Sequence, residues 1–174
     1  MTKITPLNEE IKLENNRYLV SETDSKGNIT YCNDYFTEIS GYKREELLGQ
    51  QHNIIRHPDM PRVVFKLLWD RIQSGKNINA LVKNLAKDGR YYWIFTEFKT
   101  RVDLDTKTVI GYTAHRKTIS DDVIEIISFL YSDLREIEEK EDMEAAEKYL
   151  NEFLREKGKD INFANLLDNI HKFY

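Results

Sequence analysis

The chain has 174 residues, of which 40% are hydrophobic and 32% are charged, and its formal net charge is −4. This length is enough for one domain with a core and an appendage but short for two full domains, and the composition excludes a chain too polar to form a core. Its apolar stretches fall well short of the roughly 20 residues of a membrane-spanning helix. The first residues lack the apolar run of a signal peptide, and the single cysteine, Cys32, can form no internal disulfide. We therefore expect a soluble cytoplasmic protein with no direct membrane insertion.

The charges are unevenly distributed along the chain. Residues 121–160 contain 14 aspartates and glutamates against 6 lysines and arginines, whereas the remaining residues contain 16 acidic and 20 basic side chains. The basic residues of the remainder are scattered and form no lysine or arginine run. Because nucleic-acid-binding surfaces need a concentrated basic patch, no nucleic-acid partner is expected.

The start of the chain predicts a cap and a hairpin. Residues 1–16 carry a few apolar side chains among polar ones, which is typical of a short amphipathic cap rather than a strand. Residues 17–24 and 29–33 are strand-like and flank a turn that contains Gly27. This arrangement predicts a β-hairpin.

Two short helices are expected next. Asp34 can cap the first helix, which would end at Gly41, and the second would run from Lys43 to Gly49. The segment 50–61 is polar and interrupted by prolines. A loop without regular structure is therefore expected there.

A longer helix and three strands follow. A helix is expected there because the apolar residues recur at three- and four-residue steps. It should begin near Pro61, since proline fits the first helical turn, and end at Gly75. Strand-like runs joined by polar turns then predict an antiparallel meander at residues 78–86, 91–101 and 108–117. This order of elements indicates the α+β class, with helices covering one face of an antiparallel sheet.

Beyond residue 120 the pattern becomes helical. One apolar stripe consists of Val123, Ile126, Ile127, Leu130, Leu134 and Ile137, and another of Ala146, Tyr149, Leu150, Phe153 and Leu154. Gly158 breaks the second run. A last short helix is expected to carry Phe163, Leu166, Leu167 and Ile170.

The order of elements resembles the PAS fold, in which a five-stranded antiparallel sheet and several helices enclose a small-molecule pocket. Its generic signals are Asp24 to Asn33, Ser40-Gly41-Tyr42, Glu46 to Gly49 and Lys87-Asp88-Gly89. A more specific set consists of His52-Asn53-Ile54-Ile55-Arg56-His57-Pro58-Asp59-Met60-Pro61, Phe65, Trp69, Val82-Lys83-Asn84, Tyr92-Trp93 and Gly111-Tyr112. This set resembles the PAS domain of aerotaxis receptors of the Aer type and the soluble PAS halves of two-protein energy-taxis receptors. The resemblance covers residues 17–117 and divides the chain into an N-terminal cap (1–16), a PAS sensor domain (17–120) and an acidic helical extension (121–174).

The resemblance implies that the pocket holds FAD. The family's cofactor positions fall on Asn33, Arg56, His57, Asp59 and Asn84, with Phe65 on the long helix, and Trp69 on the same helix is a further candidate. The sequence departs from the family at Ile78, where a tryptophan is usual.

The chemistry of the two asparagines agrees with this site. An asparagine side chain both donates and accepts hydrogen bonds, so Asn33 and Asn84 can match the alternating carbonyl and N–H groups of a flavin ring edge. For each of them, a place in a turn or on the solvent-facing side of a strand is the alternative.

The other candidates also have two interpretations. The guanidinium of Arg56 can bind the pyrophosphate of FAD, or it can pair with Asp59 and hold the loop. His57 can contact the cofactor, or only fix the loop by a hydrogen bond to a backbone carbonyl. Phe65 and Trp69 are either cofactor contacts or parts of the core.

Single residues also bear on other chemistries. A light-driven adduct of the LOV type needs a cysteine in an Asn-Cys-Arg motif, but the loop here reads Asn53-Ile54-Ile55-Arg56. Cys32 is therefore interpreted as a small buried residue. Haem b is the main rival cofactor, since one histidine can ligate its iron, and His52 or His57 offers such a ligand.

No enzyme is expected. The phosphate-binding loop, the nucleophile elbow and the paired-histidine metalloprotease motif are all absent from the sequence. The residues after position 120 are too few for a kinase or cyclase domain.

The resemblance instead implies a soluble redox or energy sensor that relays its state to a membrane-anchored signalling protein of the chemoreceptor type. The alternatives are a haem-binding PAS gas or redox sensor and a cofactor-free PAS interaction module that forms a homodimer. The helices beyond residue 120 can fold back on the sheet or on a second copy of the chain. They can also present an acidic amphipathic face to a basic segment of the receptor.

Overall fold

The computed structural model describes residues 4–157 and 163–170 of the chain. Its centre is a five-stranded antiparallel sheet with the order β2-β1-β5-β4-β3. The strands are β1 (Leu19–Asp24), β2 (Ile29–Cys32), β3 (Ile78–Leu85), β4 (Tyr91–Val102) and β5 (Val109–Lys117). The predicted α+β class, the hairpin and the three-strand meander are confirmed.

Between β2 and β3 the chain forms helical segments that cover one face of the sheet. They are α1 (Asp34–Ser40), α2 (Arg44–Leu47), the one-turn 3-10 helix η1 (His52–Ile55) and α3 (Arg62–Gln73). Apolar side chains of α3, such as Val64 and Leu68, are buried against the sheet. The predicted positions of the two short helices and of the long helix are confirmed.

The cap of α1 differs from the prediction by one residue. The N-cap is Asn33, whose Oδ1 accepts a hydrogen bond from the backbone N–H of Phe36 at 3.0 Å. Asp34 is already helical, and its carboxylate pairs with Arg44. Either side chain could cap a helix, but the preceding strand leaves Asn33 in the extended conformation that a cap requires. Gly41, at φ 71°, ends the helix as predicted.

The segment 50–61 contains a helical turn where the sequence predicts only loop. The N–H of Ile54 donates to the Gln51 carbonyl at 3.1 Å, and that of Arg56 donates to the Asn53 carbonyl at 3.0 Å. The prolines, which lack an N–H group, come after this turn and do not interrupt it.

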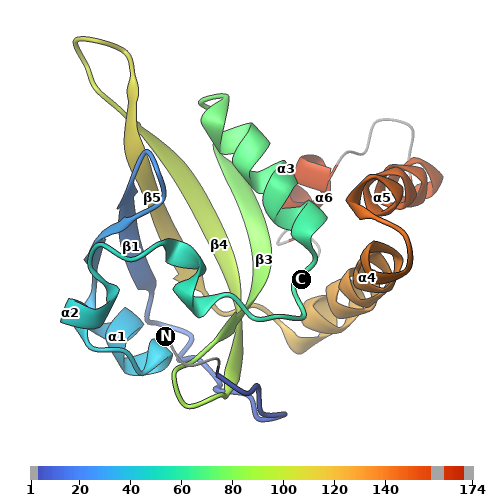
Figure 1. Ribbon diagram of the computed structural model, residues 1–174, viewed down its shortest axis with the longest axis horizontal. Helices are drawn as coiled ribbons and strands as arrows, with labels where there is room; N and C mark the ends of the chain where they lie inside the picture. The colour runs from blue at the N-terminus through green and yellow to red at the C-terminus, as the bar shows by residue number, and fades with distance from the viewer. Residues whose placement is uncertain (1–3, 158–162, 171–174) are drawn as a thin grey trace.

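The end of the chain forms α4 (Asp121–Lys140), α5 (Met143–Lys157) and α6 (Phe163–Ile170). Figure 1 shows these helices beside α3 and the edge strand β3, away from α1 and α2. The Tyr131 hydroxyl of α4 donates to the Leu81 carbonyl of β3 at 2.8 Å, and its ring lies 6.2 Å from that of Trp93. The extension therefore folds back on the sheet. The predicted break at Gly158 lies outside the described residues.

The first predicted stripe of α4 needs one correction. Val123, Ile127, Leu130 and Leu134 are buried, but the side chain of Ile126 is 52% exposed. One residue is 100° of helical rotation, so Ile126 is turned away from the face that carries the others. Of the second stripe, Ala146, Leu150 and Leu154 are buried, whereas Tyr149 and Phe153 are half-buried.

A side chain of α4 caps the N-terminus of α3. Glu138 is buried, and its Oε2 and Oε1 accept hydrogen bonds from the backbone N–H groups of Arg62 at 2.9 Å and Val63 at 2.7 Å. The residue preceding the helix is Pro61, which offers no side-chain acceptor. A residue far along the chain thus satisfies N–H groups that have no partner within the helix.

Residues 4–16, for which the sequence predicts a short amphipathic cap, form an extended strap that bridges to Tyr91 of β4. The N–H of Leu7 donates to Gly89 at 2.8 Å and that of Ile11 to Tyr91 at 2.7 Å, which ties the strap to the beginning of β4. The domain boundaries at residues 16 and 120 stay predictions. Among the described residues, no helix combines the length and the apolar character needed to cross a membrane.

Candidate functional site

A cavity of about 230 Å³ lies between α3, the η1 turn and the sheet. Its apolar lining consists of Phe65, Leu68, Trp69, Ile72, Val82, Ile94, Phe98, Tyr112 and Ala114. Its polar lining consists of Ser21, Thr23, Gln51, His52, Asn53, Arg56, Asn84, Thr96 and Arg116. Within the described part of the chain, no aspartate or glutamate lines it. The volume lies below the roughly 300–1,000 Å³ of complete ligand pockets, so the cavity suits one planar ring system rather than a whole dinucleotide.

Strand alternation places Asn84 in this cavity. Successive side chains of a strand point to opposite faces, so Asn84 shares the cavity face of β3 with Val82. Asn84 is buried, and its backbone forms a β-bridge with Arg56, which brings the η1 loop to the strand. On β4, where it pairs with Ala80, Thr96 also lines the cavity, and its buried hydroxyl has no hydrogen-bond partner among the described residues. The cavity therefore offers polar groups that a ligand can satisfy.

Arg56 lines the cavity together with Phe65. Its guanidinium carbon lies 4.0 Å from the centre of the Phe65 ring, and its Nη2 donates to the Met60 carbonyl at 3.4 Å. Burial lowers the pKa of Arg56. Asp59 pairs with Lys83 at 2.7 Å instead, so the alternative in which Arg56 and Asp59 hold each other is wrong.

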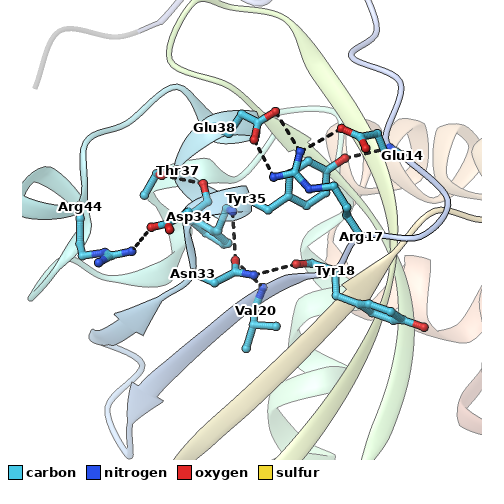
Figure 2. Close-up of polar contacts among 11 residues, drawn as sticks. Glu14, Arg17, Tyr18, Val20, Asn33, Asp34, Tyr35, Thr37, Glu38 and Arg44 are labelled. Carbon is cyan, nitrogen blue, oxygen red and sulfur yellow. Dashed lines mark hydrogen bonds and ion pairs between the residues drawn. The ribbon is translucent and has the colours of Figure 1, made fainter.

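Asn33 does not line the cavity. Figure 2 shows its side chain between β1 and α1, where Oδ1 accepts from the N–H groups of Val20 and Phe36, both at 3.0 Å. Its Nδ2 donates to the Tyr18 carbonyl at 2.8 Å. Through these three backbone hydrogen bonds the amide joins the strand to the helix.

His57 and Asp59 also lie outside the cavity lining. The ring of His57 is buried, and its Nδ1 accepts a hydrogen bond from the Asp59 N–H at 3.1 Å. Burial and the nearby Lys83 lower the pKa of His57 to about 4. His57 thus fixes the loop, although by accepting from an N–H group and not by donating to a carbonyl.

A polar network that was not predicted from the sequence lies on the sheet side of the cavity. Arg116 of β5 is 2% exposed, and its Nη1 donates to the Ser21 hydroxyl at 2.9 Å. Its Nη2 lies 2.7 Å from Nε2 of His52. The signal was present in the alternation of β5, because Arg116 shares a face with the buried Tyr112 and Ala114.

Trp69 lines the cavity, with its ring 5.6 Å from that of Tyr112. Gly27 leaves room for it, since a Cβ there would lie 3.0 Å from Trp69 Cη2 and the backbone φ is +84°. Ile78 is buried but does not line the cavity. Cys32 is likewise buried away from it, and burial raises the pKa of its thiol.

Comparison with known proteins gives a consistent result. The family described as "PAS fold" matches residues 29–116. The aerotaxis receptor of Escherichia coli (strain K12) is 37% identical over 116 residues, which are 67% of this chain and 22% of that receptor. The chain therefore spans about a fifth of the length of this relative.

Solved structures agree in fold. The light-state structure of the blue-light photoreceptor Aureochrome1 LOV superposes with a TM-score of 0.56 at 21% identity, covering 62% of this chain and 86% of that one. A light-oxygen-voltage domain studied with a flavin analogue gives a TM-score of 0.55 at 19% identity, covering 63% and 82%. At these identities the likeness concerns the fold alone.

Proposed function

Because the chain belongs to the PAS family, we propose that it is a sensor that binds FAD, with the flavin ring in the cavity and the rest of the molecule reaching beyond it, and relays the redox state of the flavin to a chemoreceptor-type partner. The observation that carries the proposal is the composition of the cavity. It combines apolar walls for a planar ring with the buried polar groups of Asn84 and Thr96 and with two arginines, and no acidic side chain of the described residues lines it. A flavin with its phosphates needs such surroundings. The expectation of FAD comes from the resemblance of the motif around Arg56 to aerotaxis receptors, and the 37% identity to one such receptor supports that resemblance.

The residues have separate roles in this proposal. Bound FAD would supply reversible uptake of electrons at its ring. The amide of Asn84 would hydrogen-bond the ring edge, and Leu68, Ile72 and Ile94 would exclude water from its faces. Arg56 would bind the phosphates, with its guanidinium oriented by stacking on Phe65. Asn33, His57 and Asp59 would hold the surrounding backbone without touching the ligand.

The two asparagines provide a matched test of the site. In apo-protein reconstituted with FAD, we expect visible flavin absorption for the wild type and at least about tenfold weaker binding for Asn84→Ala, which removes a buried partner. Asn33→Ala should lower the free energy of unfolding by about 1–2 kcal/mol through loss of the cap, with flavin affinity of the folded protein unchanged. Absorbance titration and urea unfolding measure both. A wild-type protein that stays colourless would refute the proposed cofactor, and the reverse pattern in the variants would place Asn33 in the site.

Arg56→Ala should separate ring binding from phosphate binding. We expect about a tenfold or greater loss of FAD affinity, since a charged hydrogen-bonded contact to phosphate is lost, and little change for riboflavin, which has no phosphate. Fluorescence titration with FAD, FMN and riboflavin checks this expectation. Arg90→Ala is the control, because the side chain of Arg90 pairs with Asp88 in a turn outside the cavity. An equal loss for all three flavins would assign Arg56 to the loop scaffold.

Haem is not favoured by the two candidate ligands. His52 lines the cavity, but its Nε2 lies 2.7 Å from Arg116 Nη2 and 3.0 Å from Ser21 Oγ. An iron ligand needs that nitrogen lone pair free, and His57 lies outside the lining. The absorption spectrum of the purified protein distinguishes a Soret band from flavin bands.

The relay is proposed to pass through α4. Glu138 of α4 caps α3, which forms a wall of the cavity, and Arg135 donates to the Pro58 carbonyl in the Arg56 loop. A displacement of α3 or of the loop would therefore shift α4 as well. Cutting the chain after Ser120 would remove these contacts, so truncation cannot separate signalling from folding.

The outer face of α4 is the proposed contact with the partner. Ile126 and Phe129 are 52% and 65% exposed, and Asp122, Glu125 and Asp133 are exposed on the same helix. This face fits a basic cytoplasmic segment of a membrane-anchored receptor, and salt should weaken the association. A homodimer through the same face is the alternative assembly.

A further inference from the structure

Glu138 of α4 carries a buried negative charge at the beginning of α3. Its side chain is 4% exposed, and its two oxygens accept hydrogen bonds from the backbone N–H groups of Arg62 at 2.9 Å and Val63 at 2.7 Å. The guanidinium of Arg62 also pairs with it at 3.3 Å, but that side chain is 61% exposed. Water screens a charge in such a position only weakly on the side that faces the protein. The Glu138 charge therefore acts on the groups buried around it.

Arg56 is anchored two residues away from this cap. Its Nη2 donates to the Met60 carbonyl at 3.4 Å, whereas Glu138 accepts from the N–H of Arg62. Two residues of chain span at most about 7 Å, so the guanidinium and the carboxylate are bound to adjacent parts of one turn. Burial lowers the pKa of Arg56, and the Glu138 charge opposes that shift. The cavity arginine and the α4 carboxylate thus stabilise each other electrostatically.

A phosphate bound to Arg56 would disturb this balance. In the proposed function the phosphates of FAD lie on Arg56, so they bring negative charge to the turn that already holds the Glu138 carboxylate. Like charges in a poorly hydrated region repel each other, and the phosphate also takes up the Arg56 charge that now stabilises Glu138. Riboflavin has the same ring without phosphates and brings no such charge. The two flavins should therefore affect Glu138 differently.

We propose that the phosphates of FAD and the Glu138 cap oppose each other, so that a phosphate-bearing flavin loosens α4 from α3 and riboflavin does not. This inference rests on the proposed function and adds to it a link between cofactor loading and the extension. Coupling between two sites is reciprocal. The factor by which docked Glu138 weakens FAD binding therefore equals the factor by which FAD weakens the docking. The extension then distinguishes loaded from empty protein before any change of redox state.

Glu138→Gln tests the charge, because glutamine has the same shape and still offers an oxygen to the α3 N–H groups. The dissociation constants of oxidised FAD and of riboflavin are measured by fluorescence titration of the apo-protein. We expect about tenfold tighter binding of FAD, since couplings between sites are typically about 5–150-fold, and an unchanged affinity for riboflavin. Glu136→Gln is the matched control. Its carboxylate lies on the same helix, is 61% exposed and pairs with Lys140, so neither affinity should change.

Hydrogen exchange of the wild type measures the reciprocal effect without a substitution. Amide exchange of residues 131–140 is followed by mass spectrometry with saturating FAD and with saturating riboflavin. We expect these amides to exchange about tenfold faster in the FAD form, because the looser helix opens more often. A ligand that only stabilises the fold slows exchange, so faster exchange confined to α4 indicates loosening of this helix.

An FAD affinity in Glu138→Gln equal to or below that of the wild type would refute the inference while leaving flavin binding, and so the proposed function, intact. Equal tightening for FAD and riboflavin would also refute it, because the effect would then not depend on phosphate. If Glu138→Gln does not fold, the exchange experiment decides, and α4 amides that exchange no faster with FAD than with riboflavin overturn the inference. A wild type that does not bind FAD would remove the proposed function and this inference together.

Discussion

Glu138→Ala is expected to lower the free energy of unfolding by about 3 kcal/mol. The substitution removes a buried carboxylate that accepts from the backbone N–H groups of Arg62 and Val63. Each N–H group left without a partner in a buried position costs about 1–3 kcal/mol. No local side chain can replace the cap, because Pro61 precedes the helix. Urea unfolding followed by far-ultraviolet circular dichroism measures the loss.

Glu136→Ala on the same helix is the matched control. The carboxylate of Glu136 is 61% exposed and pairs with Lys140 one turn away. Because exposed pairs of this kind contribute little, its unfolding midpoint should match that of the wild type. Equal midpoints for Glu138→Ala and Glu136→Ala would mean that α4 does not cap α3 in solution. The proposed relay would then lack the contact between Glu138 and α3 on which it depends.

Acidification from pH 7 to pH 5 should destabilise the protein through its buried histidines. Burial lowers the pKa of His57 to about 4, whereas the unfolded chain protonates histidine near the ordinary value of about 6.5. The unfolded state therefore binds more protons over this range, so stability is complete above about pH 7 and falls as the pH decreases toward 4. The expected loss from His57 is about 2 kcal/mol at pH 5, at about 1.36 kcal/mol per pH unit below 6.5. His52, whose pKa is lowered to about 3, contributes in the same direction.

Substitution by glutamine isolates each histidine, because glutamine does not titrate. Unfolding free energies at pH 7, 6 and 5 should decline less steeply in His57→Gln and in His52→Gln than in the wild type. If both variants keep the wild-type slope, the pH dependence arises from other groups and the two imidazoles are not held neutral in the folded state.

The elements were predictable because their signals are local. Strand-like runs joined by polar turns predict β3, β4 and β5, and the apolar spacing of residues 61–75 predicts α3. The η1 turn was missed because the prolines of segment 50–61 indicated a loop. Both prolines come after the last hydrogen bond of the turn, so they do not prevent it. Ile126 was misplaced because a run of apolar residues does not by itself indicate which of them faces outward.

The site was predictable only in part. Arg56, Phe65, Trp69 and Asn84 line one cavity, and their contact with a cofactor stays a prediction. Asn33 has the same chemistry as Asn84, but three backbone groups within 3.0 Å already engage its amide. Which role an asparagine takes depends on neighbours in space, and a linear sequence does not contain that information.

Two contacts depend on tertiary structure in the same way. Glu138 reaches α3 across 75 residues of sequence, and no local pattern distinguishes it from the other glutamates of α4. The contacts of Arg116 with Ser21 and His52 join three strands or turns that are far apart in the sequence, so only the folded structure shows them.

The chain contains two tryptophans, and they lie in the two regions that the proposed relay connects. Trp69 lines the cavity, whereas Trp93 packs against Tyr131 beneath α4. A single-tryptophan protein made by Trp93→Phe would emit only from the ligand site, and one made by Trp69→Phe only from the junction with the extension. Stopped-flow fluorescence of this pair, which needs no attached dye, would give the order in which the two regions respond.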